Sequence, residues 1–141
     1  MRYLRERKLD LVIVSLKQPV LGICLGMQLM CASSEENETA CLGIVPYRVR
    51  RFELETLKTP HTGWNRILQL RSPLFNGVTE GSRVYFVHGY YAETGDETTA
   101  FTDYGHQFSA GVERDNFHAI QFHPEKSGAV GERILENFLK I

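Results

Sequence analysis

The stretch Gly22-Ile23-Cys24-Leu25-Gly26 places one cysteine between two glycines, where an apolar run gives way to a helical pattern. A nucleophile on a sharp strand-to-helix turn needs such neighbours, because its backbone is strained and nearby side chains would collide with the adjoining strand or helix. The start of a helix also favours the thiolate, and the Leu25 amide would point at a forming oxyanion. The alternative is that Cys24 is a small hydrophobe in the core.

His123 and Glu125, in the stretch "QFHPE", could supply the base that such a thiol needs. The base must take the proton of the thiol and return it to a leaving nitrogen, and histidine titrates in the right range. A carboxylate two residues away can orient the imidazole through its other ring nitrogen. The alternative is that His123 ends a strand beside a surface glutamate. The other candidate bases have no carboxylate at comparable spacing after a strand end; they are His61, His88, His106 and His118.

The elements around these residues indicate one α/β domain over residues 1–141, with some antiparallel strands. The pattern predicts a helix over residues 3–16, a buried strand at "VLGIC" and a short helix after Cys24. A hairpin turn at Asp115-Asn116 leads into a strand that His123 closes. Further strands are expected at 41–52, 83–93, 98–105 and 107–114, and an amphipathic helix at 129–141. Only one helix precedes "VLGIC", so the usual upstream strands of such a sheet have no source here.

The composition excludes several other classes. The net charge is -1, which gives no electrostatic argument for binding nucleic acid or an anionic membrane. No apolar run approaches the roughly 18 residues that a membrane span needs, and the first residues lack the apolar segment of a secretion signal. Three cysteines at spacings unlike common zinc or redox motifs agree with a reducing compartment. We therefore expect a cytoplasmic protein that uses no metal and no other cofactor.

Four stretches together resemble one family. "PVLGICLGMQLM" and "QFHPEKSG" look like the class I, triad-type glutamine amidotransferases, which carry G-x-C-x-G-x-Q and H-P-E motifs in this order. "PHTGWN" and "YFVHGYYAET" are similar to the glutaminase subunit of imidazole glycerol phosphate synthase, although Thr62 stands where methionine is commoner. The resemblance implies a flavodoxin-like three-layer α/β/α sheet with added antiparallel strands, lacking the first strands of the family fold.

The resemblance implies a role for each matching residue. Cys24 would attack the side-chain amide of glutamine, forming a γ-glutamyl thioester and releasing ammonia. His123 would act as base and then as acid, with Glu125 holding its ring. Gln28 matches a position that contacts the substrate, and the Gly89-Tyr90 backbone matches the segment that receives its amino-acid end. Gly89 stands where serine or threonine is commoner, which would cost a hydroxyl contact.

The resemblance also implies a partner in histidine biosynthesis. Ammonia would pass to a cyclase subunit with a (β/α)8 barrel, which converts an aminoimidazole-carboxamide ribonucleotide to imidazole glycerol phosphate and a purine precursor. The positions that match the family's subunit interface are Trp64, Asn65, Tyr85 and Lys126. The alternatives are a core position for Trp64, either strand face for Tyr85 and a solvated charge for Lys126.

The family's chains begin roughly 55 residues earlier, by the same resemblance. That segment supplies the first strands and a Pro-Gly-x-Gly loop that donates the second amide of the oxyanion hole, and no such loop precedes Cys24 here. Losing one oxyanion donor typically costs about 100- to 1,000-fold in turnover. The 141 residues alone are therefore expected to show little glutaminase activity and to be unstable, aggregation-prone or assembled in a way unlike the family.

Three other functions stay open. The first is an amidotransferase subunit of the anthranilate or aminodeoxychorismate type, which shares the triad without P-H-x-G-W-N. The second is a non-catalytic remnant that only binds a partner or another copy of itself. The third is a cysteine hydrolase on a related fold that acts on γ-glutamyl peptides.

Overall fold

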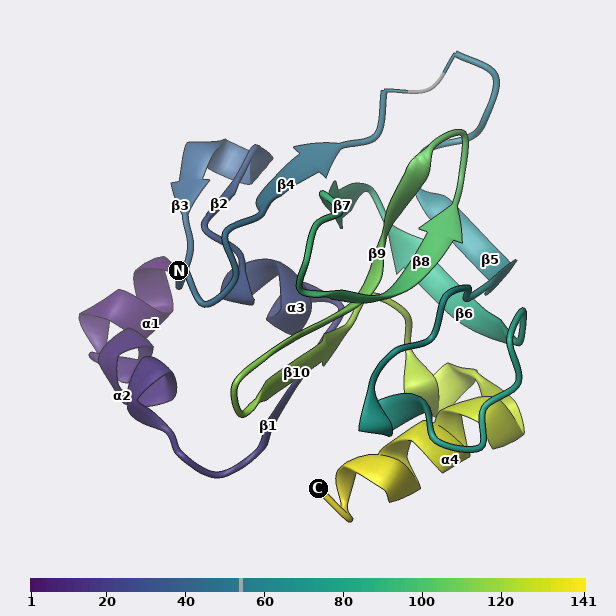
Figure 1. Ribbon diagram of the computed structural model, residues 1–141. Helices are drawn as coiled ribbons and strands as arrows, with labels where there is room; N and C mark the ends of the chain where they lie inside the picture. The colour runs from purple at the N-terminus through teal and green to yellow at the C-terminus, as the bar shows by residue number, and fades with distance from the viewer. Residues whose placement is uncertain (54) are drawn as a thin grey trace.

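The computed structural model, which describes residues 1–53 and 55–141, is built around a mixed β-sheet (Figure 1). Eight strands form it in the order β1-β10-β9-β7-β4-β2-β3, with β8 pairing along β9, and β5 and β6 form a separate pair. β1 pairs in parallel with β10 and β2 with β4, whereas the other pairs are antiparallel. The strands are β1 (Val20–Ile23), β2 (Ser33–Ser34), β3 (Thr39–Ala40), β4 (Arg48–Arg51), β5 (His61–Arg66), β6 (Arg83–His88), β7 (Tyr90–Ala92), β8 (Thr98–Asp103), β9 (Gln107–Arg114) and β10 (Phe117–Ile120).

Helices cover both faces of this sheet. Ala119 of β10 belongs to an apolar cluster with Met27 and Met30 of α3 (Leu25–Met30). Its neighbour Ile120 belongs to a second cluster, together with Ile134 of α4 (Gly128–Phe138). Successive side chains of a strand point to opposite faces, so α3 and α4 pack on opposite sides of the sheet. The three-layer α/β/α architecture is therefore confirmed.

Strand β1 lies at one end of the sheet, and β10 is its single neighbour in the described part of the chain. The parallel register sets Ile23 opposite Ile120, so both strands end at the same edge of the sheet. Residues that follow β1 and residues that follow β10 therefore start from adjacent points.

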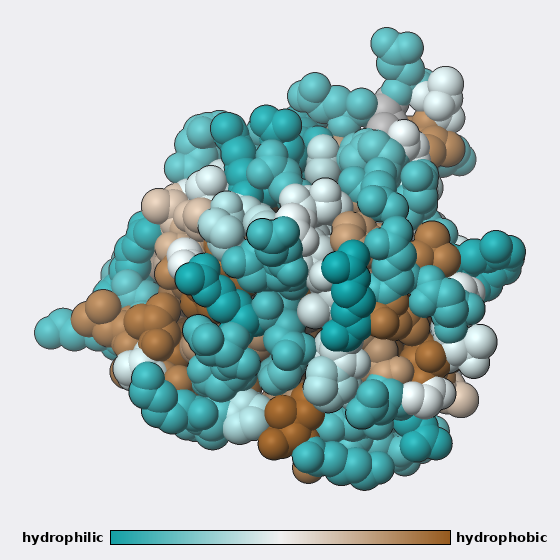
Figure 2. All heavy atoms as spheres, in the orientation of Figure 1, coloured by the Kyte–Doolittle hydropathy of each residue, from teal (hydrophilic) through white to brown (hydrophobic). Residues whose placement is uncertain are grey.

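The predicted helix over residues 3–16 is wrong as one element, because the chain breaks into α1 (Arg2–Glu6) and α2 (Leu9–Ser15). Lys8 adopts a left-handed backbone with φ 56°, which ends one helix before the next begins. Neither helix buries a residue, and Leu11 and Val12 are exposed. Figure 2 shows apolar surface on the left, where Figure 1 places these helices. Among the described residues, no helix is long and apolar enough to cross a membrane.

The strand predictions are confirmed for β8 and β9, whereas others need correction. The expected strand at 41–52 is reduced to β4, because Gly43 has φ 69° and Pro46 follows shortly after it. The segment 83–93 is divided between β6 and β7, and β10 ends at Ile120 rather than at His123. Strand β5 was not predicted, because its strand character depends on pairing with β6 rather than on an alternating pattern. The short helical turns are η1 (Glu36–Glu38), η2 (Pro73–Phe75) and η3 (Pro124–Lys126).

Candidate active site

Cys24 and His123 follow neighbouring parallel strands. The Cys24 amide donates to the carbonyl of Ile120, the last residue of β10, at 2.8 Å. The carboxyl ends of parallel strands meet at one edge of a sheet, which is where α/β proteins place their sites. The next residue after β10, Gln121, donates from Nε2 to the Cys24 Sγ at 3.5 Å. The topology therefore brings the turn after β10 onto the thiol, although these residues are far apart in sequence.

Cys24 occupies a strained turn between β1 and α3, with φ 51° and ψ -103°. A cysteine in this region costs about 1–3 kcal/mol, and such strain is typical of functional sites. A Cβ on Gly22 would lie 2.9 Å from the backbone carbon of Gly26 and 2.9 Å from Met30 Cε, so Gly22 permits the close approach of strand and helix. A Cβ on Gly26 would meet nothing within 4 Å. The expectation that both glycines avoid a collision is therefore wrong for Gly26.

Burial raises the pKa of the Cys24 thiol above its ordinary value. A hydrogen bond from the Leu25 amide and one from the Gln121 side chain lower this pKa, but they do not outweigh the burial. The expectation that the turn favours the thiolate is thus wrong, because the net effect is a higher pKa of the Cys24 thiol. Because the thiol is mostly protonated at neutral pH, any nucleophilic role requires a base that removes its proton during attack.

His123 and Glu125 form a hydrogen-bonded pair at the turn η3. His123 Nδ1 lies 2.7 Å from Glu125 Oε1, so Nε2 is the ring nitrogen that can exchange a proton with a substrate or a thiol. Burial opposes the ionisation of Glu125, but its own backbone amide and His123 outweigh that effect, and the pKa of Glu125 lies below its ordinary value. The carboxylate is therefore ionised at neutral pH and can stabilise a positive charge on His123.

The turn that carries this pair is held by β6 and α4. The His123 amide donates to the Tyr85 carbonyl at 2.9 Å. Ser127 Oγ accepts from the Tyr85 amide at 2.9 Å and donates to the His123 carbonyl at 2.6 Å. Gly131 of α4 packs directly on the Pro124 carbonyl, where a Cβ would overlap the oxygen. These contacts therefore fix the backbone that carries the His123 ring.

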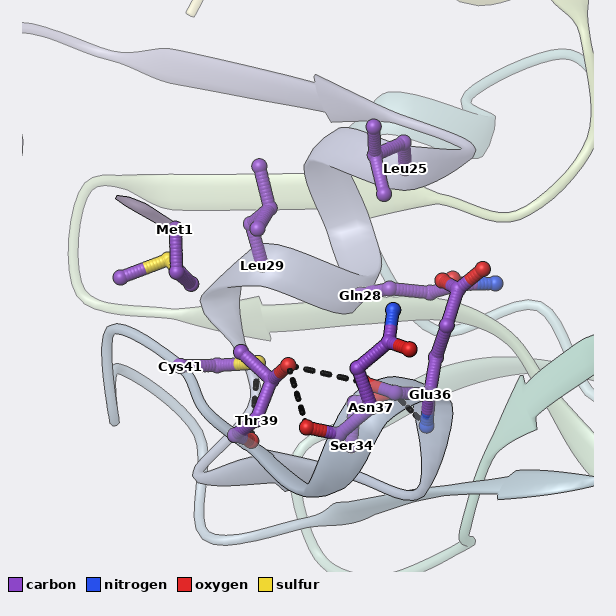
Figure 3. Close-up of a pocket in the computed structure, with 9 residues that line it drawn as sticks. All are labelled: Met1, Leu25, Gln28, Leu29, Ser34, Glu36, Asn37, Thr39 and Cys41. Atoms are coloured by element: carbon purple, nitrogen blue, oxygen red, sulfur yellow. Dashed lines mark hydrogen bonds between the residues drawn. The ribbon is translucent and has the colours of Figure 1, made fainter. Parts of the chain in front are cut away.

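A pocket opens beside the start of α3, and Leu25, Gln28 and Glu36 are among its lining residues (Figure 3). Gln28 Nε2 donates to the Tyr90 carbonyl and to Gln121 Oε1, both at 3.0 Å. The two positions that the family resemblance assigns to the substrate, Gln28 and Tyr90, are thus in contact. Figure 3 shows the Glu36 and Gln28 side chains extending to the same side of the pocket.

Sequence reasoning missed Gln121 and Glu36. Gln121 could have been noticed as the one polar residue between the apolar strand and His123, and it is fully buried. Glu36 carries no sequence signal, because only the fold brings the turn η1 to the pocket. Gly89 donates no side chain, and its carbonyl accepts the Phe52 amide at 3.1 Å. No group of three metal-ligating side chains occurs among the described residues.

Three of the four expected interface residues cluster around the Tyr85 ring. Trp64 packs edge-on against it with centroids 6.1 Å apart, and Lys126 Nζ lies 5.7 Å from its centroid. The core alternative for Trp64 is wrong, because this residue is 55% exposed. Asn65 does not join the cluster. Its Nδ2 donates to the Asp103 carbonyl at 2.8 Å and lies 3.3 Å from His61 Nε2, on the other face of β5.

Comparison with known proteins places these features in a family. Residues 5–141 match the family model described as glutamine amidotransferase class-I. Over its whole length the chain is 54% identical to the imidazole glycerol phosphate synthase subunit HisH of Bacteroides fragilis (strain YCH46), 73% of which it covers. It is 47% identical to the HisH subunit of Shewanella loihica, 67% of which it covers.

Solved structures share the fold at low sequence identity. A glutamine amidotransferase from Thermotoga maritima superimposes with a TM-score of 0.63 at 19% identity, over 96% of this chain and 53% of that one. Another glutamine amidotransferase gives a TM-score of 0.65 at 15% identity, over 99% of this chain and 68% of that one. With the family model and the HisH relatives, these matches lead to one conclusion: the chain belongs to the class I glutamine amidotransferase family.

Proposed function

We propose that this chain is the glutaminase subunit of an imidazole glycerol phosphate synthase in histidine biosynthesis. It hydrolyses glutamine to glutamate and ammonia through Cys24, His123 and Glu125. The observation that carries this proposal is the 2.7 Å His123–Glu125 pair on the turn that follows β10, together with the strained Cys24 that follows β1, the parallel neighbour of β10. The 54% identity to a HisH subunit supports this pathway rather than that of another amidotransferase.

The geometry supports a thioester mechanism. His123 takes the proton of Cys24 as the sulfur attacks the side-chain carbonyl of glutamine, and Glu125 stabilises the resulting imidazolium. The Leu25 amide, which lowers the pKa of the Cys24 thiol, is placed to stabilise the negative charge on the carbonyl oxygen. His123 then returns the proton to the leaving nitrogen, so ammonia departs and the γ-glutamyl thioester remains. Water, deprotonated by the same histidine, hydrolyses the thioester and restores the thiol.

The pocket beside α3 suits the amino-acid end of glutamine. Glu36 supplies a carboxylate that can pair with the α-ammonium group, and Gln28 lines the same pocket one helical turn after the nucleophile. We assign the Gly89–Tyr90 backbone to the same end of the substrate, because the Tyr90 carbonyl accepts a hydrogen bond from the Gln28 side chain. The reactive amide then points back towards Cys24.

The cluster of Trp64, Tyr85 and Lys126 is the surface that we assign to the cyclase partner. It presents the exposed ring of Trp64, a residue type that often anchors interfaces, beside the ammonium group of Lys126. Its Tyr85 carbonyl bonds the His123 amide, so this surface adjoins the catalytic turn. A partner with a (β/α)8 barrel seated there would receive ammonia close to where it is released.

Labelling with a glutamine-analogue electrophile tests the assignment of the nucleophile. We expect the label on Cys24, lost in His123→Ala and retained in Cys31→Ala, whose thiol is fully buried. Ammonia release from glutamine, measured with the cyclase subunit present, should exceed release from γ-glutamyl peptides. Label on Cys31 or Cys41, or full labelling in His123→Ala, would contradict the proposal.

A second measurement tests the substrate pocket. Glu36→Gln removes the charge that faces the α-ammonium but keeps the shape of the side chain. We expect the KM for glutamine to rise about tenfold with little change in kcat, since one charge-assisted hydrogen bond is lost. A matched control is Glu38→Gln, which alters a neighbouring carboxylate of η1 that does not line this pocket.

A further inference from the structure

We propose that Gln121 and the buried pair His61–His88 are positioning residues, joined in one hydrogen-bond chain that runs from Asn65 of β5 to the Cys24 thiol. The chain holds the sulfur and the Gln28 side chain in a single arrangement. It rests on the proposed function only in that Cys24 is taken as the nucleophile. None of the three side chains needs to touch the substrate for this role.

The links nearest the thiol fix the orientation of two buried amides. Gln121 is fully buried, and its Nε2 donates to Cys24 Sγ at 3.5 Å. Its Oε1 accepts from Gln28 Nε2 at 3.0 Å, and the second hydrogen of that nitrogen goes to the Tyr90 carbonyl, also at 3.0 Å. Rotating the Gln28 amide by half a turn would place its oxygen against two other oxygens. Rotating the Gln121 amide would place its NH2 group against that of Gln28. Gln121 can therefore donate to the sulfur in one orientation only.

The Tyr90 carbonyl also fixes the tautomers of the two histidines. It can only accept, so His88 Nδ1, 2.7 Å away, must carry the hydrogen. His88 Nε2 then accepts from His61 Nδ1 at 3.0 Å, which leaves His61 Nε2 to accept from Asn65 Nδ2 at 3.3 Å. The other hydrogen of this Asn65 amide goes to the Asp103 carbonyl. The Tyr90 carbonyl therefore joins two halves of the chain, because it accepts both from His88 Nδ1 and from Gln28 Nε2. Within each half, every hydrogen has a defined acceptor.

Both histidines are held in the neutral form that this chain requires. They are 3% and 5% exposed. Burial lowers the pKa of His61 to about 4 and that of His88 to about 4. The hydrogen bond to the Tyr90 carbonyl raises the pKa of His88, but burial outweighs it, and the charges of His61 and His123 act in the same direction as burial. A proton added to either ring would set two N–H groups against each other. At neutral pH the chain is therefore intact.

Aromatic packing excludes water from the middle of the chain. The His61 ring stacks between Tyr104, at 4.0 Å between centroids, and Phe86, at 4.8 Å. His88 packs against Phe52 at 5.3 Å and against Phe108 at 5.3 Å. In such surroundings a lost hydrogen bond is not replaced by one to solvent, so each link is costly to break. This cost is the physical reason why the hydrogen-bond chain can hold the Gln28, Gln121 and Cys24 side chains in one arrangement.

The intrinsic reactivity of the Cys24 thiol tests the chain without requiring turnover. The rate of alkylation by iodoacetamide is measured from about pH 6 to pH 10 and read at Cys24 by tandem mass spectrometry. Gln121→Met keeps the volume but removes the donor to sulfur, so we expect the apparent pKa of Cys24 to rise and the rate at neutral pH to fall about tenfold. Gln121→Glu should slow the reaction further, because a carboxylate repels the thiolate. His118→Asn is the control, a buried histidine outside the chain that should leave the profile unchanged.

The far links are tested by His88→Asn. Its side-chain amide can still donate to the Tyr90 carbonyl, but it offers no ring nitrogen to His61. We expect a fall in the alkylation rate of about threefold, and less than the product of the two effects when it is combined with Gln121→Met. Thermal unfolding of each variant checks that the fold persists.

Two results would overturn the proposal: an unchanged pH profile in folded Gln121→Met or Gln121→Glu, or effects of the two sites that simply multiply. Alkylation needs neither glutamine nor a partner. If ammonia release fails while the profiles shift as expected, the proposed reaction is wrong and the chain stands. If ammonia release succeeds while the alkylation profiles stay unchanged, the proposed reaction stands and the hydrogen-bond chain is wrong.

Discussion

The two turns that carry the candidate triad leave adjacent strands of the sheet, but they are held in different ways. The turn after β1 concentrates strain in one residue, Cys24, and depends on one close approach, that of Gly22 to α3. The turn after β10 contains no such strain at His123, and it is fixed by Tyr85, Ser127 and the packing of α4. We infer from this difference that the two turns have separate roles. The first turn sets the reactivity of the Cys24 sulfur, and the second sets the position of the His123 imidazole.

Low pH should produce the largest difference between the two turns, because it should destabilise the region that holds the second turn before it affects the first. His88 ends the strand β6 that holds the second turn, and burial lowers the pKa of His61 and of His88 from 6.5 to about 4. Because the unfolded chain binds more protons between these values, the free energy of unfolding falls as the pH drops from 6.5 towards 4, by up to about 1.4 kcal/mol per pH unit for each histidine. Urea unfolding across this range measures the slope, and hydrogen exchange should show β5 and β6 opening before β1.

The His88→Asn variant is the control for this acid effect. It removes one of the two titrating rings, so its slope should be about half that of the natural sequence. Equal slopes in the two proteins would show that other groups cause the acid sensitivity.

Gly131→Ala should produce the largest change among single substitutions. Its Cβ would overlap the Pro124 carbonyl oxygen, which belongs to the backbone and cannot simply rotate away. We expect the free energy of unfolding to fall by about 3 kcal/mol, with loss of labelling at Cys24 because the His123 ring moves. Urea denaturation and the labelling assay measure the two effects. Stability and labelling both equal to those of the natural sequence would show that α4 does not hold this turn.

The first turn offers a matched pair of glycines. Gly22→Ala would set a Cβ 2.9 Å from the Gly26 backbone, so we expect a loss of about 2 kcal/mol. Gly26→Ala meets nothing within 4 Å and should instead add up to about 1 kcal/mol, since alanine favours the helix. Chemical denaturation of both variants decides this, and equal losses would mean that the helix cannot accept the methyl group that the structure allows.

Ser127→Ala should have the smallest loss in this series. It leaves the Tyr85 amide without its 2.9 Å acceptor and removes a donor to the His123 carbonyl. We expect a loss of about 1–2 kcal/mol and a larger relative loss of labelling than in Gly26→Ala. Ser127→Thr keeps the hydroxyl and should restore much of the labelling. If it does not, the hydroxyl is not what positions His123.

The local patterns predicted most of the elements that carry the site. The strand β1, the helix α3 and the hairpin turn at Asp115 are confirmed, because each depends on residues next to one another in the sequence. The single helix over residues 3–16 was wrong where a left-handed residue interrupts it. Strand β5 was missed because its partner β6 lies some distance along the chain, and pairing rather than propensity makes it a strand.

The sequence by itself determined the order and spacing of the reactive residues, the local turn at Cys24 and the family to which they belong. Only the tertiary structure decided that β1 and β10 end side by side, that Gln121 reaches the sulfur and that Glu36 enters the pocket. It also decided the direction of the pKa shift of Cys24, against the local expectation. The physical reason is that backbone turns depend on neighbouring residues, whereas burial and hydrogen bonding between strands depend on groups that folding alone brings together.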